Sequence, residues 1–172
     1  MKQKSRLALS VVLAVASVAI GPASTGATAQ STSQEDVKAA TARFHSVRQA
    51  EGAGYSGAHE PCVSSPLGTM GFHYVNDDLM KDDAVDPLRP EILLYVPKKN
   101  GRLQLVGVEY WVRDADGDLT TTQDRPSLFG QDFDGPMPGH APHMPVHYDL
   151  HLWQWETNPA GIFAPFNSNL SC

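Results

Sequence analysis

The chain has little cysteine, little positive charge and only one long apolar run. Two of its 172 residues are cysteines, and 13 Lys and Arg stand against 19 Asp and Glu, which gives a formal net charge of −6. A chain this acidic lacks the basic surface that nucleic acid or an anionic lipid headgroup requires, so we expect neither as a partner. Beyond the N-terminus, no run approaches the roughly 20 apolar residues of a membrane-spanning helix.

Familiar catalytic motifs are also absent. The sequence contains no G-x-S-x-G, no H-E-x-x-H and no phosphate-binding glycine loop. The three aspartates Asp114, Asp116 and Asp118 resemble the start of a calcium-binding loop. The EF-hand pattern fails, because its glycine position is Leu119 and its glutamate position is Arg125. We therefore interpret this segment as an Asp/Gly turn.

The long apolar run belongs to an N-terminal segment with the three parts of a signal peptide. Basic residues precede an uncharged apolar core at 7–20, and small residues end in an Ala-x-Ala site at 27–29. We predict cleavage near Ala29/Gln30, a signal peptide over 1–29 and a single domain over 30–172, located outside the cell or in the cell envelope. An uncleaved membrane anchor is the alternative, and no cysteine follows the site to carry a lipid.

The rest of the chain predicts an α+β fold, in which an N-terminal helix packs on an antiparallel sheet. The helix is expected to begin after a capping box of Ser33 and Asp36 and to end at Gly52. Apolar residues repeat along it at helical spacing: Val37, Ala40, Phe44 and Val47. It would cover one face of the sheet.

Alternating apolar residues predict four strands, at 70–75, 92–96, 103–112 and 146–152. Asn100-Gly101 between the second and third is a strong hairpin signal. On the third strand, one face is expected to carry Val106, Val108, Tyr110 and Val112. The Asp-, Gly- and Pro-rich segments 76–90 and 113–143 are expected to be loops. Without β-α-β alternation the sheet should be antiparallel, with a β-sandwich or barrel-like closure as the alternative.

The two cysteines, Cys62 and Cys172, remain in the predicted domain. An even cysteine count in an exported chain indicates a disulfide, which would join the last residue to the body of the domain. Two free thiols or an intermolecular bond are the alternatives.

The last predicted strand carries the most distinctive polar pattern. Its odd positions are His147, Asp149, His151, Trp153 and Trp155, whereas its even positions are apolar. Imidazole and carboxylate are ligands for zinc, copper or iron, and the nearby methionines would suit copper. The candidate metal ligands are His73, His147, Asp149 and His151, with Glu109, His140 and His143 as further possibilities. Neighbours on one strand face are about 6.6 Å apart, so ligands from other strands would be needed.

Three functions are compatible with this pattern. The first is a secreted binding protein that holds a small ligand or a copper or zinc ion. The second is an enzyme, metal-dependent or acid–base, that uses His147, Asp149 or His151. The third is a structural or envelope-interaction protein, in which the histidines serve only packing and hydrogen bonding. The sequence specifies neither the ligand nor the oligomeric state.

Two blocks of sequence resemble a family of small secreted bacterial proteins of unknown function. They are Cys62-Val63-Ser64 with Met70–Asn76, and Gly135–His140 with Met144–His151, Asn158–Gly161 and Cys172. The resemblance spans most of the predicted domain. It implies secretion but no activity or cofactor. His73, His147, Asp149 and His151 lie within the blocks without an implied role.

Overall fold

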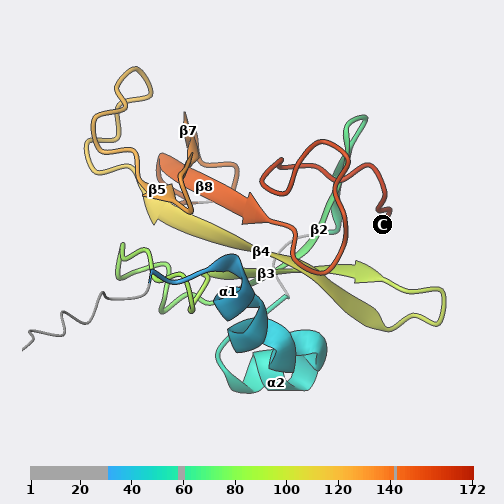
Figure 1. Cartoon of the computed structure of the whole chain (residues 1–172). Helices are drawn as coiled ribbons and strands as arrows, with labels where there is room; N and C mark the ends of the chain where they lie inside the picture. The colour runs from blue at the N-terminus through green and yellow to red at the C-terminus, as the bar shows by residue number, and fades with distance from the viewer. Residues whose placement is uncertain (1–30, 58–60, 142) are drawn as a thin grey trace, which may run out of the picture. The chain divides into compact units, whose positions relative to one another are not determined.

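An antiparallel sheet of six strands forms the centre of the fold (Figure 1), in the order β1-β2-β3-β4-β8-β7. The computed structural model describes residues 31–57, 61–141 and 143–172, and the predicted signal peptide and its cleavage site lie outside these residues. Ser31–Cys172 form one compact unit. The elements are α1 (Gln34–Thr41), the 3₁₀ turn η1 (Ala42–His45), α2 (Val47–Gly52), β1 (Val63–Ser65), β2 (Gly68–Val75), β3 (Ile92–Pro97), β4 (Leu103–Arg113), β5 (Ser127–Leu128), β6 (Gln131–Asp132), β7 (Asp134–Met137) and β8 (His147–Leu152).

The sheet curls into a half-barrel, so the protein is mostly β with little helix. This agrees with the antiparallel sheet of the predicted α+β fold and only loosely with the class itself. Each of the four predicted strands is present, as β2, β3, β4 and β8. Among the described residues no helix is long and apolar enough to cross a membrane.

The predicted single helix is wrong, because the segment is broken into α1, η1 and α2. Its start agrees with the prediction, since Ser33 and Asp36 form a complete capping box. The break lies at Ser46, whose backbone is extended at φ −94° and ψ 107°. The Tyr95 hydroxyl donates to the Phe44 carbonyl at 2.5 Å. A contact from the sheet therefore takes an acceptor that a continuing helix would have used.

Both faces of the sheet are buried. The helical segment packs on one face, the helix face, through Val37, Phe44 and Ala50. The opposite face, called here the second face, holds a smaller apolar cluster: Ile92, Leu94, Val96, Val106, Trp111 and Trp153. Because β3 is covered on both sides, its residues Ile92 to Val96 are all buried.

The predicted face of β4 is wrong at one residue. Val108, Tyr110 and Val112 belong to the helix-face core, but Val106 belongs to the second face. Leu94 pairs with Gly107 and Tyr95 with Leu105, so Val106 is an extra residue without a partner on β3. Such a bulge shifts the alternation of side chains by one position.

The predicted loop 113–143 contains three short strands. The last of them, β7, joins the main sheet by pairing with β8, while β5 and β6 pair with each other. These strands have two to four residues, and β7 contains glycine and proline. A strand this short gives no alternating pattern for the sequence to reveal.

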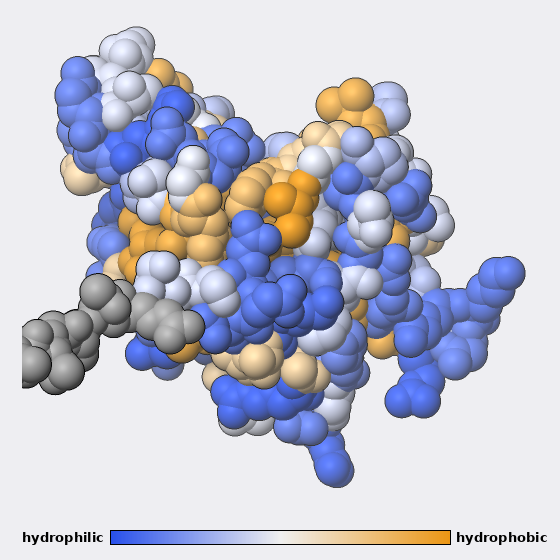
Figure 2. Space-filling view, in the orientation of Figure 1, coloured by the Kyte–Doolittle hydropathy of each residue, from blue (hydrophilic) through white to orange (hydrophobic). Residues whose placement is uncertain are grey.

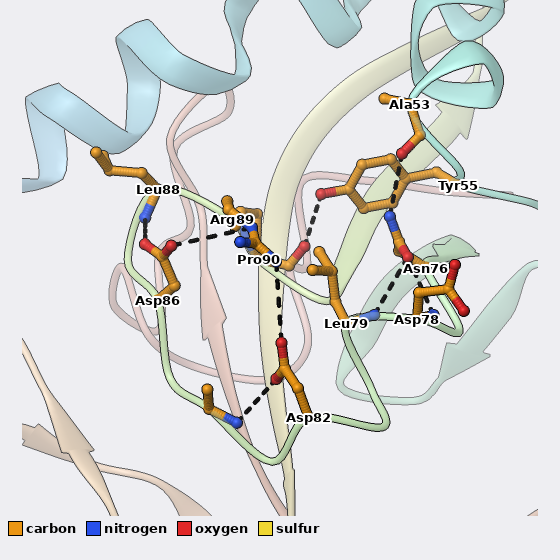
Figure 3. A network of polar contacts seen from close by, with 11 residues as sticks. Ala53, Tyr55, Asn76, Asp78, Leu79, Asp82, Asp86, Leu88, Arg89 and Pro90 are labelled. Carbon is orange, nitrogen blue, oxygen red and sulfur yellow. Dashed lines mark hydrogen bonds and ion pairs between the residues drawn. The ribbon is translucent and has the colours of Figure 1, made fainter.

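The predicted loop 76–90 is confirmed and is held by a polar network (Figure 3). Asn76 donates from Nδ2 to the Ala53 carbonyl and accepts at Oδ1 from the Asp78 and Leu79 amides. The Tyr55 hydroxyl donates to the Pro90 carbonyl at 2.7 Å. These bonds fix both ends of the loop against the helical segment and so position β2 and β3.

The β3–β4 hairpin turns at Gly101, as predicted. Gly101 N donates to Lys98 O at 2.8 Å, and Gly101 has φ +75°. A Cβ at Gly101 would meet no atom within 4 Å, so only the backbone conformation restricts this position. We expect Gly101→Val to lower the free energy of unfolding by about 1–2 kcal/mol. Urea denaturation measures this loss. Gly101→Asn, which tolerates positive φ, is the control, and an equal loss in both variants would contradict the explanation.

Cys62 and Cys172 form a disulfide, as predicted. The C-terminal segment also bridges to β2, because Thr69 and Asn167 exchange two backbone hydrogen bonds. The irregular C-terminal segment is therefore attached to the β1–β2 edge of the sheet at two points, Cys62 and Thr69.

Candidate metal centre

Three strands bring polar side chains together on the second face of the sheet. Glu109 on β4 is the direct partner of His151 on β8. His73 on β2 is in register with Leu94, which is in register with Gly107 on β4. Because Gly107 has no side chain, β4 presents no side chain at the position in register with Leu94 and His73.

His73, Glu109 and His151 form a tight group, called here the His/Glu cluster. His73 Nε2 lies 3.2 Å from Glu109 Oε2, and His151 Nε2 lies 3.6 Å from the same oxygen. One ligand atom from each residue lies within 4.8 Å of the other two. On the far side of the ring, His151 Nδ1 lies 3.7 Å from Asp149 Oδ1.

The cluster is buried, and several of its polar atoms have no hydrogen-bond partner among the described residues. The side chains of His73, Glu109 and His151 are 11%, 7% and 1% exposed. Glu109 Oε2 and both ring nitrogens of His151 find no hydrogen-bond partner within the described part of the chain. The same holds for Asp149 Oδ1. Because buried polar groups are normally hydrogen-bonded, this concentration of unpaired atoms needs an explanation.

The charges of the cluster are complementary. Burial raises the pKa of Glu109, but the nearby His151 and His73 lower it by more than burial raises it. The pKa of Glu109 therefore lies below its ordinary value. Burial lowers the pKa of His151, but Glu109 and Asp149 raise it more, and it lies above its ordinary value. Glu109 is therefore a carboxylate at neutral pH, and a positive charge beside it, whether a protonated imidazole or a metal ion, is favourable.

A cavity of about 700 Å³ opens above the cluster. His73, Glu109, Asp149 and His151 line it, and the rest of its wall is mainly apolar. The wall includes every methionine after Met1: Met70, Met80, Met137 and Met144. Such a wall, with a few converging polar groups, is typical of a small-molecule site.

The structure separates the predicted ligands into three sets. His73, His151 and Glu109 form the cluster, and Asp149 lies beside it. His147 is on the same strand face, but its Nδ1 lies 3.0 Å from the Pro145 carbonyl and its ring stacks on Trp111. Exposed His140 and His143 line the cavity instead.

Trp153 follows the predicted alternation, whereas Trp155 does not. Trp153 stacks on His151 on the second face, with ring centroids 6.3 Å apart. Trp155 contacts His45 and Lys38 of the helical segment. β8 ends at Leu152, so the alternation does not extend to Trp155.

Comparison with protein families, curated proteins and solved structures finds no match to this chain. The assignment of a function therefore depends on the geometry of the cluster and the cavity.

Glu109 is only a further possibility in the sequence pattern, yet it lies between the two histidines of the cluster. It is the one carboxylate between apolar residues in the middle of β4, where a lone charge is costly. That signal marks it as the centre of a site. By contrast, no sequence signal places Met70 and Met80 on the same wall as Met137 and Met144, since the pairs belong to segments that meet only in the folded chain.

Proposed function

We propose that this protein is a secreted binding protein that holds one transition-metal ion, zinc or copper, at His73, Glu109 and His151. The observation that carries the proposal is the convergence of three ligand atoms, of which Glu109 Oε2 and His151 Nε2 are buried and have no hydrogen-bond partner within the described residues. Two imidazoles and a carboxylate are a common donor set for zinc, copper and iron. The disulfide and the predicted signal peptide support secretion.

The distances fit a shared ion. Two ligand atoms bound to zinc at 2.0–2.1 Å and at the tetrahedral angle are about 3.3 Å apart. The corresponding separations from Glu109 Oε2 are 3.2 Å to His73 and 3.6 Å to His151.

Asp149 supports the site without binding the ion. Its Oδ1 faces Nδ1 of His151, while Nε2 of the same ring faces Glu109. A carboxylate on the outer nitrogen of a ligating histidine fixes its tautomer and orientation. We therefore assign Asp149 to the orientation of His151.

The centre would leave a fourth position open toward the cavity. The apolar wall fits a small, largely apolar molecule that reaches the ion through one polar group. Three protein ligands with an open position are also typical of catalytic zinc, so a metal-dependent enzyme is the second candidate. A turnover assay on the metal-loaded protein distinguishes the two.

Metal binding is tested by calorimetric titration of chelator-treated protein with Zn(II) and Cu(II). We expect about one equivalent of one of these ions to bind wild type. Glu109→Gln keeps the size of the side chain and removes its charge, and His151→Ala removes a ligand. Both variants should lose about 100-fold or more in affinity, because each deletes a direct ligand. Affinity should also fall toward acid pH, where protons compete for the imidazoles.

Two further histidine variants are the controls. His45→Ala removes an exposed imidazole on the helical segment and should bind as wild type does. His147→Ala should lose much less affinity than His151→Ala, because His147 contacts the Pro145 carbonyl instead. The proposal is wrong if wild type binds neither ion or if Glu109→Gln binds as tightly as wild type.

A further inference from the structure

A second group of carboxylates lies at the far end of β4, in the loop that leads to β5. The loop forms part of a largely hydrophilic projection from the molecule (Figure 2, upper left). Asp114 follows the last residue of β4, and its amide donates to the Val146 carbonyl at 3.0 Å. The aspartate end of the loop is therefore anchored to the segment that enters β8.

Three aspartates converge in this loop. One carboxylate oxygen each from Asp114, Asp116 and Asp124 lies within 4.8 Å of the other two. Asp118, which the sequence pattern groups with them, bonds instead to the amide and hydroxyl of Thr120. Asp124 takes its place, brought back by a hydrogen bond from the Ala115 amide at 2.7 Å.

Asp114 is the unusual member, since its side chain is buried and incompletely paired. The residue is 3% exposed. Its Oδ1 accepts from the Asp116 and Gly117 amides, but its Oδ2 is buried and has no hydrogen-bond partner among the described residues. The Tyr148 hydroxyl lies 2.8 Å from Asp124 Oδ1, to which it donates. A buried carboxylate oxygen is thus left without a donor.

Positive charge does not compensate for this group within the described residues. None of the ion pairs there includes Asp114, Asp116 or Asp124. Arg125 lies over the Tyr148 ring, and its guanidinium donates to the Gly135 carbonyl. Three carboxylates that converge on one point, one of them buried, are expensive unless a cation lies between them.

We propose that Asp114, Asp116 and Asp124 bind a calcium ion. Calcium takes hard oxygen ligands, including carboxylates that keep their hydrogen bonds to backbone amides, and waters complete its coordination. A site of three carboxylates in a loop falls in the weak range of extracellular modules, with a dissociation constant of about 10⁻⁴–10⁻³ M. The bound ion holds the loop against the ends of β4 and β8. This site is independent of the His/Glu cluster and of its metal.

The test is calorimetric titration of chelator-treated protein with CaCl₂, with thermal unfolding as a second readout. One equivalent should bind. For a dissociation constant of about 1 mM, 10 mM Ca²⁺ raises the ratio of folded to unfolded protein about 11-fold and the Tm by a few degrees. Asp114→Asn should abolish binding. Asp116→Asn, at an exposed position, should weaken it about 10-fold or more.

Two controls separate this site from other causes. Asp132→Asn changes an exposed aspartate of β6 outside the group and should bind Ca²⁺ as wild type does. Glu109→Gln should also retain Ca²⁺ binding, whatever it does to Zn(II) or Cu(II). The inference is overturned if wild type shows no Ca²⁺-dependent heat or Tm shift, or if Asp116→Asn binds as tightly as wild type.

Discussion

Reduction of the Cys62–Cys172 disulfide is expected to lower the free energy of unfolding by roughly 2–5 kcal/mol. The bond joins residues 110 positions apart, so it closes a loop that contains every strand of the sheet. A cross-link over a loop of this length removes much of the conformational freedom of the unfolded chain, which destabilises that state. Urea denaturation with and without reductant measures the difference.

The Cys62→Ala/Cys172→Ala double variant is the matched control. It should be as unstable as reduced wild type, and reductant should not change it further. Alkylation of both thiols in native, unreduced protein would show that the bond does not form. A loss well below 1 kcal/mol would show that the unfolded chain is already restricted in other ways.

The second large effect is a loss of stability with rising pH, caused by Glu91. This side chain is 2% exposed and accepts from the Trp111 amide at 3.0 Å. Burial raises the pKa of Glu91 to about 8, with smaller contributions from Asp82 and Glu109. In the unfolded chain the pKa is about 4.5. The folded protein therefore binds a proton more tightly, and stability falls as pH rises from about 4.5 to about 8.

Glu91→Gln should remove this dependence. The glutamine oxygen can still accept from the Trp111 amide, and no charge is left to bury. We expect the variant to be more stable than wild type at pH 9, by an amount on the order of 3–5 kcal/mol, and similar to it at pH 4.5. Urea denaturation at both pH values tests this, with Glu51→Gln, at an exposed position, as the control. Equal pH dependence in wild type and Glu91→Gln would contradict the assignment.

The sequence predicted the long strands and the turn between two of them, because apolar residues on β2, β3, β4 and β8 are regular and Asn100-Gly101 is a strong local signal. It missed three features that depend on tertiary contacts. The helix breaks at Ser46 beside the contact from Tyr95, and Val106 changes face at a bulge opposite β3. The strand β7 exists only because β8 offers it a partner.

The candidate site was predicted in part for the same reason. Alternation placed His151 and Asp149 on one face, and the structure brings His73 and Glu109 beside them from other strands. His147 shares that alternation but lies beside the Pro145 carbonyl, since the pattern of one strand does not show what covers it. The cavity depends on how the loop 76–90 and residues 137–141 and 143–145 close over the sheet, and no local pattern encodes that.

The methionine-lined cavity also makes the site sensitive to oxidants. Met70, Met80, Met137 and Met144 are all only partly buried and line the cavity, where peroxide that enters it would meet them. Conversion of a thioether to a sulfoxide replaces a flexible apolar group with a polar one. An apolar molecule bound in the cavity would then lose contacts on several sides at once. The side chains of the His/Glu cluster would not be changed by this oxidation. Oxidation would thus weaken the binding of an apolar molecule before it affected the binding of a metal ion at the proposed site.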